Sequence, residues 1–248
     1  MKIIDWNDFI FKDHYISSKC AVTIGVFDGL HKGHRYLINQ LNDKQCSERV
    51  VFTFRDNPAR FFNKKNFYGD IYTLSQKLNA LKMTGVTTTV LIDFSGDFSK
   101  LTGNYFISCI SSHLNLVKMV VGEDFKCGKG NDTTAAVLAD NYFSDRVNFN
   151  IIKRQSFNGF PVSSSEIRSL IKRGLLDQAS DYLEFGHAID LSDLNIDQDR
   201  DCFFINKYKI KQVLPEDGNF NMSIIIGNRT FRKKVIIDNR IFKWFKSN

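Results

Sequence analysis

The sequence has no long apolar run, no paired cysteine motif and no repeated or low-complexity segment. No stretch approaches the roughly 20 apolar residues that span a bilayer, and Met1 to Trp6 lack the apolar core of a signal peptide. The five cysteines are odd in number and none belongs to a Cys-x-x-Cys pair, which favours free thiols in a reducing compartment. We therefore expect a cytoplasmic protein that has no membrane partner.

The composition is that of an ordinary globular protein, with 43% hydrophobic and 25% charged residues in 248. This length allows one full α/β domain and a small appendage, and it leaves monomer and dimer both open. The net charge of +7 favours anionic small molecules as ligands. The basic residues are dispersed, with the densest clusters at 229–234 and 243–246, and no nucleic-acid-binding motif is present. We expect a solvated basic surface and no specific nucleic-acid partner.

Strand-like and helix-like segments alternate up to about residue 153, which predicts a parallel sheet covered by helices. Several of the strands are apolar without alternation, as in strands that are buried on both faces. The predicted strands are 21–27, 49–54, 87–92, 117–122 and 147–153, and the predicted helices are 32–43, 74–84, 104–114 and 133–142. In such a sheet, a ligand binds at the carboxyl ends of the strands.

The last third of the chain changes character. A short helix at 166–171, capped by the serines that precede it, and a second at 177–183 come before an acidic, loop-like stretch at 190–201. Strands are predicted after it, at 202–211, 221–226, 230–237 and 240–245. The predicted fold is therefore α/β, with a Rossmann-like parallel sheet in residues 1–186 and a small antiparallel β domain in residues 187–248.

The segment that carries most chemical information is His31-Lys32-Gly33-His34, which follows an apolar strand and the turn signal Asp28-Gly29. It places two imidazoles and a glycine where a helix begins, and a helix N-terminus favours an anion because its backbone N–H groups are unpaired. The imidazoles could hydrogen-bond charge that develops on phosphorus during a transfer reaction. Solvated or structurally hydrogen-bonded histidines are the alternative.

A second candidate anion site is the serine run at 163–165, which leads into a helix that carries Arg168. Hydroxyl groups, a helix N-terminus and a guanidinium can together hold the outer phosphates of a nucleotide. A plain helix cap is the alternative for the serines. If Arg168 binds phosphates, Arg168→Lys should weaken the handling of the nucleotide and leave the fold intact.

Two further segments follow predicted strands: Thr53-Phe54-Arg55-Asp56-Asn57-Pro58, and Gly122-Glu123-Asp124-Phe125-Lys126-Cys127-Gly128. Together with the histidine and serine motifs, and in the same order, they make roughly residues 19–186 resemble the adenylyltransferase module of prokaryotic FAD synthetases. That module is the N-terminal half of the bifunctional riboflavin kinase/FMN adenylyltransferase. Four motifs in order are far more specific than any one of them.

The resemblance implies that AMP passes from ATP to FMN, giving FAD and pyrophosphate, with Mg²⁺ bridging the phosphates. It implies catalytic roles for His31, His34 and Arg168, and no residue can be named as a metal ligand. The implied ATP-binding residues are Gly25, Phe27, Asp28, Gly29, His31, Gly33, His34, Gly122, Asp124, Ser163, Ser164, Ser165 and Arg168. The implied FMN-binding residues are Phe54, Asn57, Pro58 and Phe125.

The sequence departs from the family pattern in several places. Asn57 stands where the family usually has His, Asp124 where it has Asn, and Cys127 where it has Phe. The segment that the family generally writes Ser-Ser-Thr-Arg-x-Arg is Ser-Ser-Ser-Glu-Ile-Arg at 163–168, so Glu166 replaces one of its two arginines. Residues 187–248 also lack the Gly-x-Pro-Thr-x-Asn segment that a riboflavin kinase uses. We expect one activity, FMN adenylyltransferase without riboflavin kinase. The alternatives are another nucleotidyltransferase of the His-x-Gly-His type, such as a cytidylyltransferase-like enzyme, or a non-catalytic flavin- or nucleotide-binding module.

Overall fold

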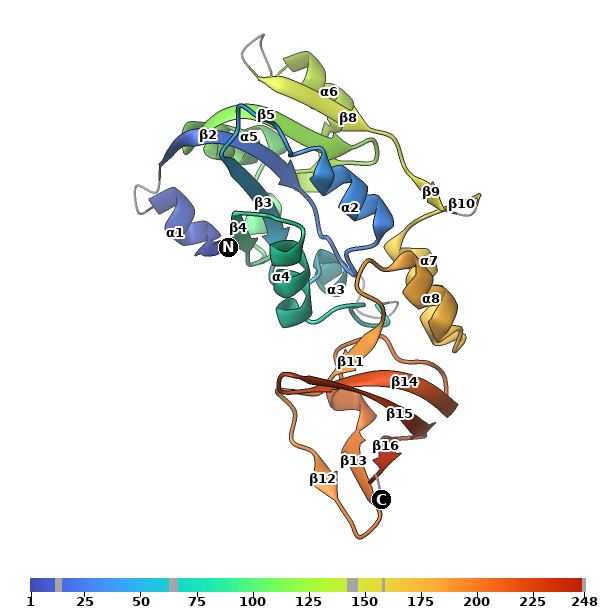
Figure 1. The fold of residues 1–248 in the computed structure, drawn as a ribbon. Helices are drawn as coiled ribbons and strands as arrows, with labels where there is room; N and C mark the ends of the chain where they lie inside the picture. Colours follow the sequence, from blue (N-terminus) through green and yellow to red (C-terminus); the bar gives the residue numbers. More distant parts are fainter. Residues whose placement is uncertain (12–14, 63–66, 142–146, 158, 247–248) are drawn as a thin grey trace. The chain divides into compact units, whose positions relative to one another are not determined.

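The computed structural model describes residues 1–11, 15–62, 67–141, 147–157 and 159–246 (Figure 1). The chain forms two compact units. Unit 1 comprises the described residues of Met1–Phe27, Gly33–Lys64 and Asn79–Pro161. Unit 2 comprises those of Asp28–Lys32, Lys65–Leu78 and Val162–Asn248. Each unit therefore contains segments that lie far apart in the sequence.

Unit 1 is built on a six-stranded sheet in the order β1-β4-β3-β2-β5-β8, in which all neighbouring strands are parallel. The bounds of the strands are β1 (Lys2–Asp5), β2 (Ile16–Ile24), β3 (Glu48–Phe54), β4 (Thr88–Ile92), β5 (Leu114–Gly122) and β8 (Asn148–Ile152). All five residues of β4 are buried, as expected for a strand that is covered on both faces. The parallel sheet and the α/β class are confirmed.

Helices cover both faces of this sheet. They are α1 (Trp6–Phe11), α2 (Lys32–Asn39), α3 (Pro58–Phe62), α4 (Leu74–Met83), α5 (Gly103–Ser112) and α6 (Ala135–Asn141). One core cluster joins α1, α5 and α6 to alternate strand residues such as Val22, Phe52 and Val121. Figure 1 shows α2 and α4 in front of the sheet and α5 behind it.

The structure corrects several predicted bounds in unit 1. β1 and α1 were missed because four strand residues and six helix residues give too little periodicity to be recognised. β2 ends at Ile24 rather than residue 27, and α2 ends at Asn39 rather than residue 43. Thr133–Thr134, predicted as helix, pairs as β7 with β6 (Lys126–Cys127), so α6 starts at Ala135. Residue 142 of that predicted helix lies outside the described residues.

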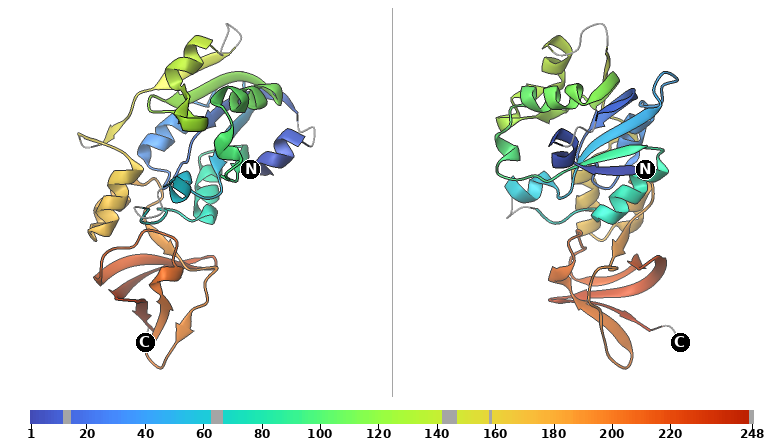
Figure 2. Two further views of the ribbon diagram at one scale, coloured as in Figure 1. Left: turned by 180° about the vertical axis from the view of Figure 1, so that it is seen from behind. Right: turned by 90° about the vertical axis from the view of Figure 1, so that its left-hand side faces the viewer.

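Unit 2 contains α7 (Ser164–Lys172), α8 (Leu176–Tyr182) and a six-stranded sheet in the order β11-β14-β15-β16-β13-β12. Its strands are β11 (Ala188–Asp190), β12 (Asp197–Gln198), β13 (Cys202–Asn206), β14 (Gly218–Ile226), β15 (Arg229–Asp238) and β16 (Ile241–Phe245). All neighbours are antiparallel except β11 and β14, and Figure 2 shows the curl of this sheet. Side chains that alternate along the strands, including Met222, Val235 and Trp244, form its core.

The antiparallel sheet was predicted, but two details differ. The stretch predicted as an acidic loop contains β12, and the strand predicted at 202–211 ends at Asn206, where the 3₁₀ helix Lys207–Lys209 follows. A short hairpin, β9 (Ser156–Phe157) with β10 (Phe160–Pro161), precedes the serine run. β11 begins at Ala188, next to the boundary predicted at residue 187, and that boundary remains a prediction.

Two further observations concern the whole described chain. Within the described ranges, no helix combines the length and the apolar character that crossing a bilayer requires. None of the five cysteines is disulfide-bonded, in agreement with the sequence.

Burial raises the pKa of the Cys127 thiol, on β6, to about 12, with Asp132 adding to the effect. This thiol is therefore protonated and unreactive at neutral pH.

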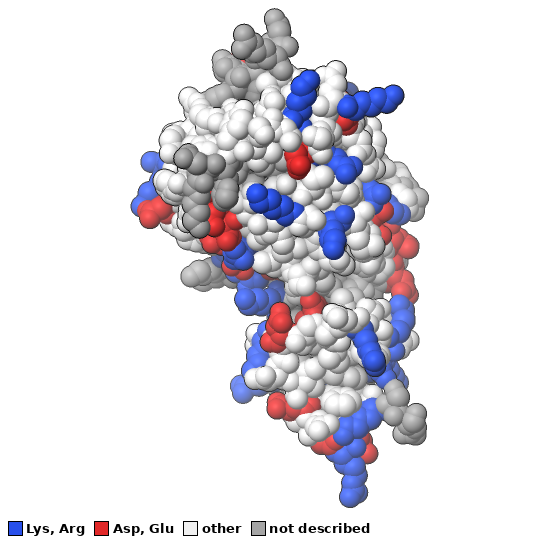
Figure 3. All heavy atoms as spheres, turned by 60° about the vertical axis from the view of Figure 1, so that its left-hand side comes forward, with Lys and Arg blue, Asp and Glu red and all other residues white. Residues whose placement is uncertain are grey.

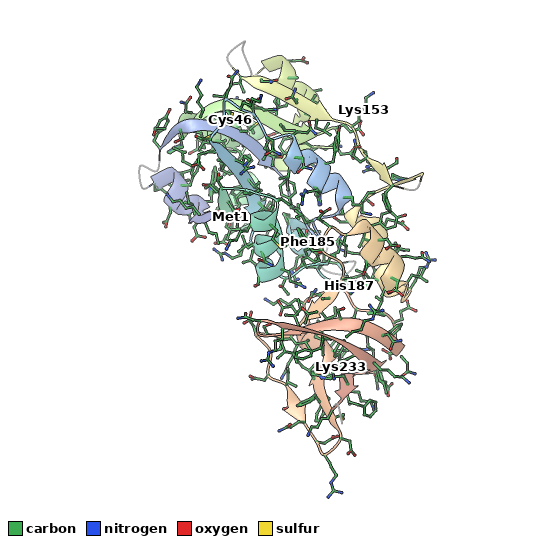
Figure 4. All side chains as sticks on the ribbon, viewed as in Figure 1. Met1, Cys46, Lys153, Phe185, His187 and Lys233 are labelled. Carbon is green, nitrogen blue, oxygen red and sulfur yellow. The ribbon has the colours of Figure 1, made fainter. Side chains whose placement is uncertain are left out.

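The pH dependence of stability follows from His187, which lies where the chain passes from α8 to β11 (Figure 4). Its Nε2 is buried and has no hydrogen-bond partner among the described residues, and burial lowers its pKa to about 4. The unfolded chain binds a proton below about pH 6.5 and the folded chain does not, so stability should fall as the pH drops from 6.5 to 4. The full loss is about 3 kcal/mol, at about 1.4 kcal/mol per pH unit.

Urea unfolding at pH 7.5 and at pH 5.0 measures this loss. His187→Gln cannot titrate, so its midpoint should depend less on pH than that of the wild type. An unchanged difference between the two pH values in His187→Gln would show that other groups cause the slope.

Candidate active site

The turn that joins β2 to α2 has an unusual backbone. Phe27 and Leu30 have φ values of 50° and 36°, which are uncommon for residues other than glycine. A Cβ on Gly25 would lie 3.0 Å from the ring of Phe27, and Gly29 has a φ of 80°, where a Cβ would also lie 3.0 Å from the side chain of Ile71. The two glycines therefore allow a tight turn that L side chains would resist.

The turn delivers the histidine motif to the start of a helix, as predicted. α2 begins at Lys32, directly after His31, which is 6% exposed and forms a backbone bridge with Leu183. The half-buried His34 lies in the first turn of α2, and its ring centroid is 5.2 Å from that of Phe27, edge to face. Phe27 therefore fixes one side of the His34 imidazole.

In unit 2, the carboxylate of Asp28 is the centre of a buried network. It is 5% exposed and accepts hydrogen bonds from the backbone N–H groups of Ile71, at 3.0 Å, and Tyr72, at 3.2 Å. The guanidinium of Arg168 forms an ion pair with it and donates to the carbonyl of Gly69 at 3.0 Å. The structure thus brings together two predicted site residues, and it joins α7 to the segment around residues 69–72.

The charge of Asp28 depends on this network. Burial raises the pKa of the Asp28 carboxyl, and the positive charge of Arg168 and the Tyr72 N–H act in the opposite direction. A buried carboxylate without its cation would be costly, because the low-dielectric interior penalises an unpaired charge. Arg168 therefore has a structural contact in addition to any contact with a nucleotide.

The three serines at the start of α7 have different environments. Ser163 is the N-cap, and its Oγ accepts a hydrogen bond from the N–H of Glu166. The hydroxyl of Ser164 donates to the carbonyl of Asp28 at 3.0 Å. Ser165 is exposed at the first turn of the helix. Capping thus accounts for Ser163, and Ser165 is the serine whose side chain is most accessible to a ligand.

The predicted FMN-binding residues follow β3. The ring of Phe54 packs against Phe94 and Phe98, with centroid distances of 5.7 and 6.1 Å. Asn57 is 8% exposed, and its side-chain oxygen accepts the N–H of Ala59 at the start of α3. Pro58 is the first residue of α3, a position that suits its fixed φ. This segment is therefore held in one conformation.

The loop after β5 holds the remaining predicted residues. Phe125 is half-buried against the core, and its N–H donates to the carbonyl of Gly122 at 3.0 Å. The exposed carboxylate of Asp124 forms an ion pair with Arg154 at 2.7 Å, and Glu123 accepts the backbone N–H of Arg154. Since β3, β2 and β5 are neighbours in a parallel sheet, the loops that follow them share one edge of unit 1.

The sequence interpretation assigned no role to Arg154 or Arg55, although each pairs with carboxylates at this edge. Both arginines directly follow a predicted strand, and this position is the one sequence signal that could have marked them as candidate site residues. Within the described ranges, no three side chains of His, Cys, Asp or Glu gather into a possible metal site.

The fold and the position of the histidine motif define a class: α/β proteins with a parallel six-stranded sheet, in which the first long strand leads through a tight turn to a helix that begins at the histidine motif. The sequence model of the FAD synthetase family matches residues 13–166. The chain belongs to the FAD synthetase family.

The names of similar proteins are consistent with this family. The bifunctional riboflavin kinase/FMN adenylyltransferase of Escherichia coli strain K12 is 30% identical over 179 residues, covering 70% of this chain and 56% of that protein. The protein of the same name from Buchnera aphidicola is 28% identical, covering 66% and 54%. The chain thus spans about half the length of these two relatives. A protein named FAD synthetase from Listeria monocytogenes is 29% identical, covering 69% and 70%.

One solved structure has the same fold over nearly the whole chain. The crystal structure titled as a macrolide-efflux protein from Streptococcus pneumoniae has a TM-score of 0.80, with 99% of this chain and 84% of that chain covered. The identity is 23%, so this likeness shows the fold alone.

Proposed function

We propose that this protein is an FMN adenylyltransferase that makes FAD and pyrophosphate from FMN and ATP in the cytoplasm. The observation that carries the proposal is the His-x-Gly-His motif, which follows a strained turn at the start of α2 in a chain of the FAD synthetase family. Motif, local structure and family all point to nucleotidyl transfer.

In the proposed reaction, a phosphate oxygen of FMN attacks the α-phosphorus of ATP. A new P–O bond forms, the bond between the α-phosphorus and the bridging oxygen breaks, and pyrophosphate leaves with that electron pair. His31 and His34 donate hydrogen bonds to the phosphate oxygens as charge builds up on them. Such reactions need mainly positioning and charge neutralisation from the protein.

The other assignments are part of the same proposal. Gly25, Phe27, Asp28, Gly29 and Gly33 shape the ATP-binding turn. Gly122 and Asp124 lie beside adenosine and flavin, and Phe54, Asn57, Pro58 and Phe125 bind FMN. Ser163, Ser164, Ser165 and Arg168 hold the outer phosphates at the N-terminus of α7.

Mg²⁺, when bound with ATP, supplies neutralising charge between the phosphates. Mg²⁺ in such reactions is commonly held by substrate phosphates and water with one or two carboxylates. Since the described residues contain no cluster of three candidate ligands, we assign no protein ligand to it.

The basic side chains give no support to a nucleic-acid partner. On the face drawn in Figure 3 the Lys and Arg side chains are scattered among acidic and uncharged ones, without a continuous stripe. Small anionic substrates fit such a distribution better than a polyanion.

Incubation of the protein with ATP, Mg²⁺ and either FMN or riboflavin, followed by chromatography of the flavins, tests the proposal. FMN should be converted to FAD, and riboflavin should remain unchanged, because residues 187–248 contain no Gly-x-Pro-Thr-x-Asn segment. FMN formed from riboflavin would contradict the proposed absence of kinase activity. Replacing ATP by CTP tests the cytidylyltransferase-like alternative, and flavin binding without turnover would indicate a non-catalytic module.

A further inference from the structure

A cluster of three charged side chains lies at the carboxyl edge of the parallel sheet. None of the three is among the residues proposed to bind ATP or FMN. Arg55 follows β3 directly, Asp93 follows β4 directly, and Asp5 is the last residue of β1. The guanidinium donates from Nε to Asp93 at 2.8 Å and from its terminal nitrogen to Asp5. Because the sheet order is β1-β4-β3, one side chain ties together the ends of three neighbouring strands.

The backbone reinforces this connection. The N–H of Arg55 donates to the carbonyl of Ile92 at 2.8 Å, so the ladder between β3 and β4 continues to the point where the ion pair begins. Two residues later, Asn57 caps the start of α3. The path of the chain from β3 to α3 is therefore fixed at both ends, by Arg55 and by Asn57.

The ion pair between Arg55 and Asp93 is next in the chain to an aromatic contact, since Phe54 precedes Arg55, Phe94 follows Asp93, and the two rings lie 5.7 Å apart between centroids. The Phe94 ring also contacts Phe61 and Phe62 of α3, with centroid distances of 5.5 and 5.2 Å. Loss of the Arg55–Asp93 pair would therefore remove one restraint on the chain that carries Phe54 and leads to α3.

We propose that Arg55 is a positioning residue for FMN: with Asp93 and Asp5, it holds the segment Phe54–Pro58 in the conformation that receives the flavin nucleotide. This inference rests on the proposed function. Arg55 acts through its neighbours, and direct contact with substrate is no part of its role.

The exposure of the three side chains indicates that the cluster contributes little to the stability of the fold, which distinguishes positioning of FMN from a purely structural role. Their exposed fractions are 39% for Arg55, 53% for Asp5 and 66% for Asp93. Ion pairs this exposed contribute at most about 1 kcal/mol to stability. Loss of the cluster should therefore leave the fold intact and appear in the binding of one substrate.

Steady-state kinetics of Arg55→Met test the proposal. Its KM for FMN should rise about fivefold, the ratio that corresponds to about 1 kcal/mol, whereas its KM for ATP and its melting temperature should stay close to the wild-type values. Arg55→Lys keeps the charge but reaches one carboxylate at a time, so it should restore part of the affinity for FMN. Lys100→Met, which removes the exposed pair between Lys100 and Asp97 in the same unit, is the matched control and should change neither KM.

A double-mutant cycle adds a second test. Asp93→Asn should also raise the KM for FMN, and the Arg55→Met/Asp93→Asn double variant should be no worse than Arg55→Met, because both changes remove the same pair. Unchanged KM for FMN in Arg55→Met, or equal rises in both KM values, would overturn the proposal. If the wild type makes no FAD at all, the proposed function has failed. In that case, quenching of FMN fluorescence measures the affinity for the flavin directly. Equal affinity in the wild type and in Arg55→Met would then overturn the positioning role.

Discussion

Replacing His34 by alanine is expected to lower kcat for FAD formation by about a hundredfold or more, as for the loss of one preorganised hydrogen-bond donor in a transition state. His31→Ala should have an effect of similar size. His34 is placed in the first turn of α2 with its ring against Phe27, and His31 is buried directly before the helix. Initial rates at saturating FMN and ATP measure the effect.

His113→Asn is the matched control for these variants. His113 follows α5, and its Nδ1 lies 2.8 Å from the carbonyl of Cys109. It lies at the amino end of β5, whereas the site loops follow the carboxyl ends of the strands. Its replacement should leave kcat near the wild-type value. Near-normal turnover in both His31→Ala and His34→Ala would show that the motif has a structural role alone.

The second large effect concerns Arg168, for which the structure adds a structural role to the one expected from the sequence. The sequence interpretation predicts an intact fold for Arg168→Lys; the structure adds that the guanidinium pairs with Asp28, which is nearly fully buried, so that a substitution without a cation also affects stability. Removing one partner of a buried pair costs about 3–5 kcal/mol, because the other charge is left uncompensated. Arg168→Met should therefore lower the free energy of unfolding by about 3 kcal/mol, measured by urea denaturation at pH 7.5.

Two comparisons separate the structural role of Arg168 from its proposed role toward ATP. Adding Asp28→Asn to Arg168→Met should recover part of the stability, because no buried carboxylate then lacks its cation. The cost of Arg168→Met should also shrink as the pH falls, since protonation of Asp28 removes the unpaired charge. Arg168→Lys retains a cation and should fold best, with a raised KM for ATP. Stability equal to that of the wild type in Arg168→Met would refute the structural role, and an unchanged KM for ATP in Arg168→Lys would refute the proposed phosphate contact.

The sequence by itself determined the features that depend on local patterns. Apolar strands alternating with helices predicted the parallel sheet, because burial on both faces leaves a continuous apolar run. Asp28-Gly29 before His31 predicted a turn leading into a helix, since glycine can adopt the positive φ that such a turn needs. The serine run predicted the start of α7, where Ser163 caps the helix.

The tertiary structure alone decided the pairings between distant residues. Asp28 and Arg168 are 140 positions apart, and no periodicity or turn signal indicates that they form a buried ion pair. β1 became the edge of the sheet through its pairing with β4, since four residues carry too weak a pattern by themselves. The sequence indicates no role for Arg55, because its two carboxylate partners come from the ends of two other strands. Local backbone preference can be derived from neighbouring residues, whereas these contacts depend on which strands pair and in which register.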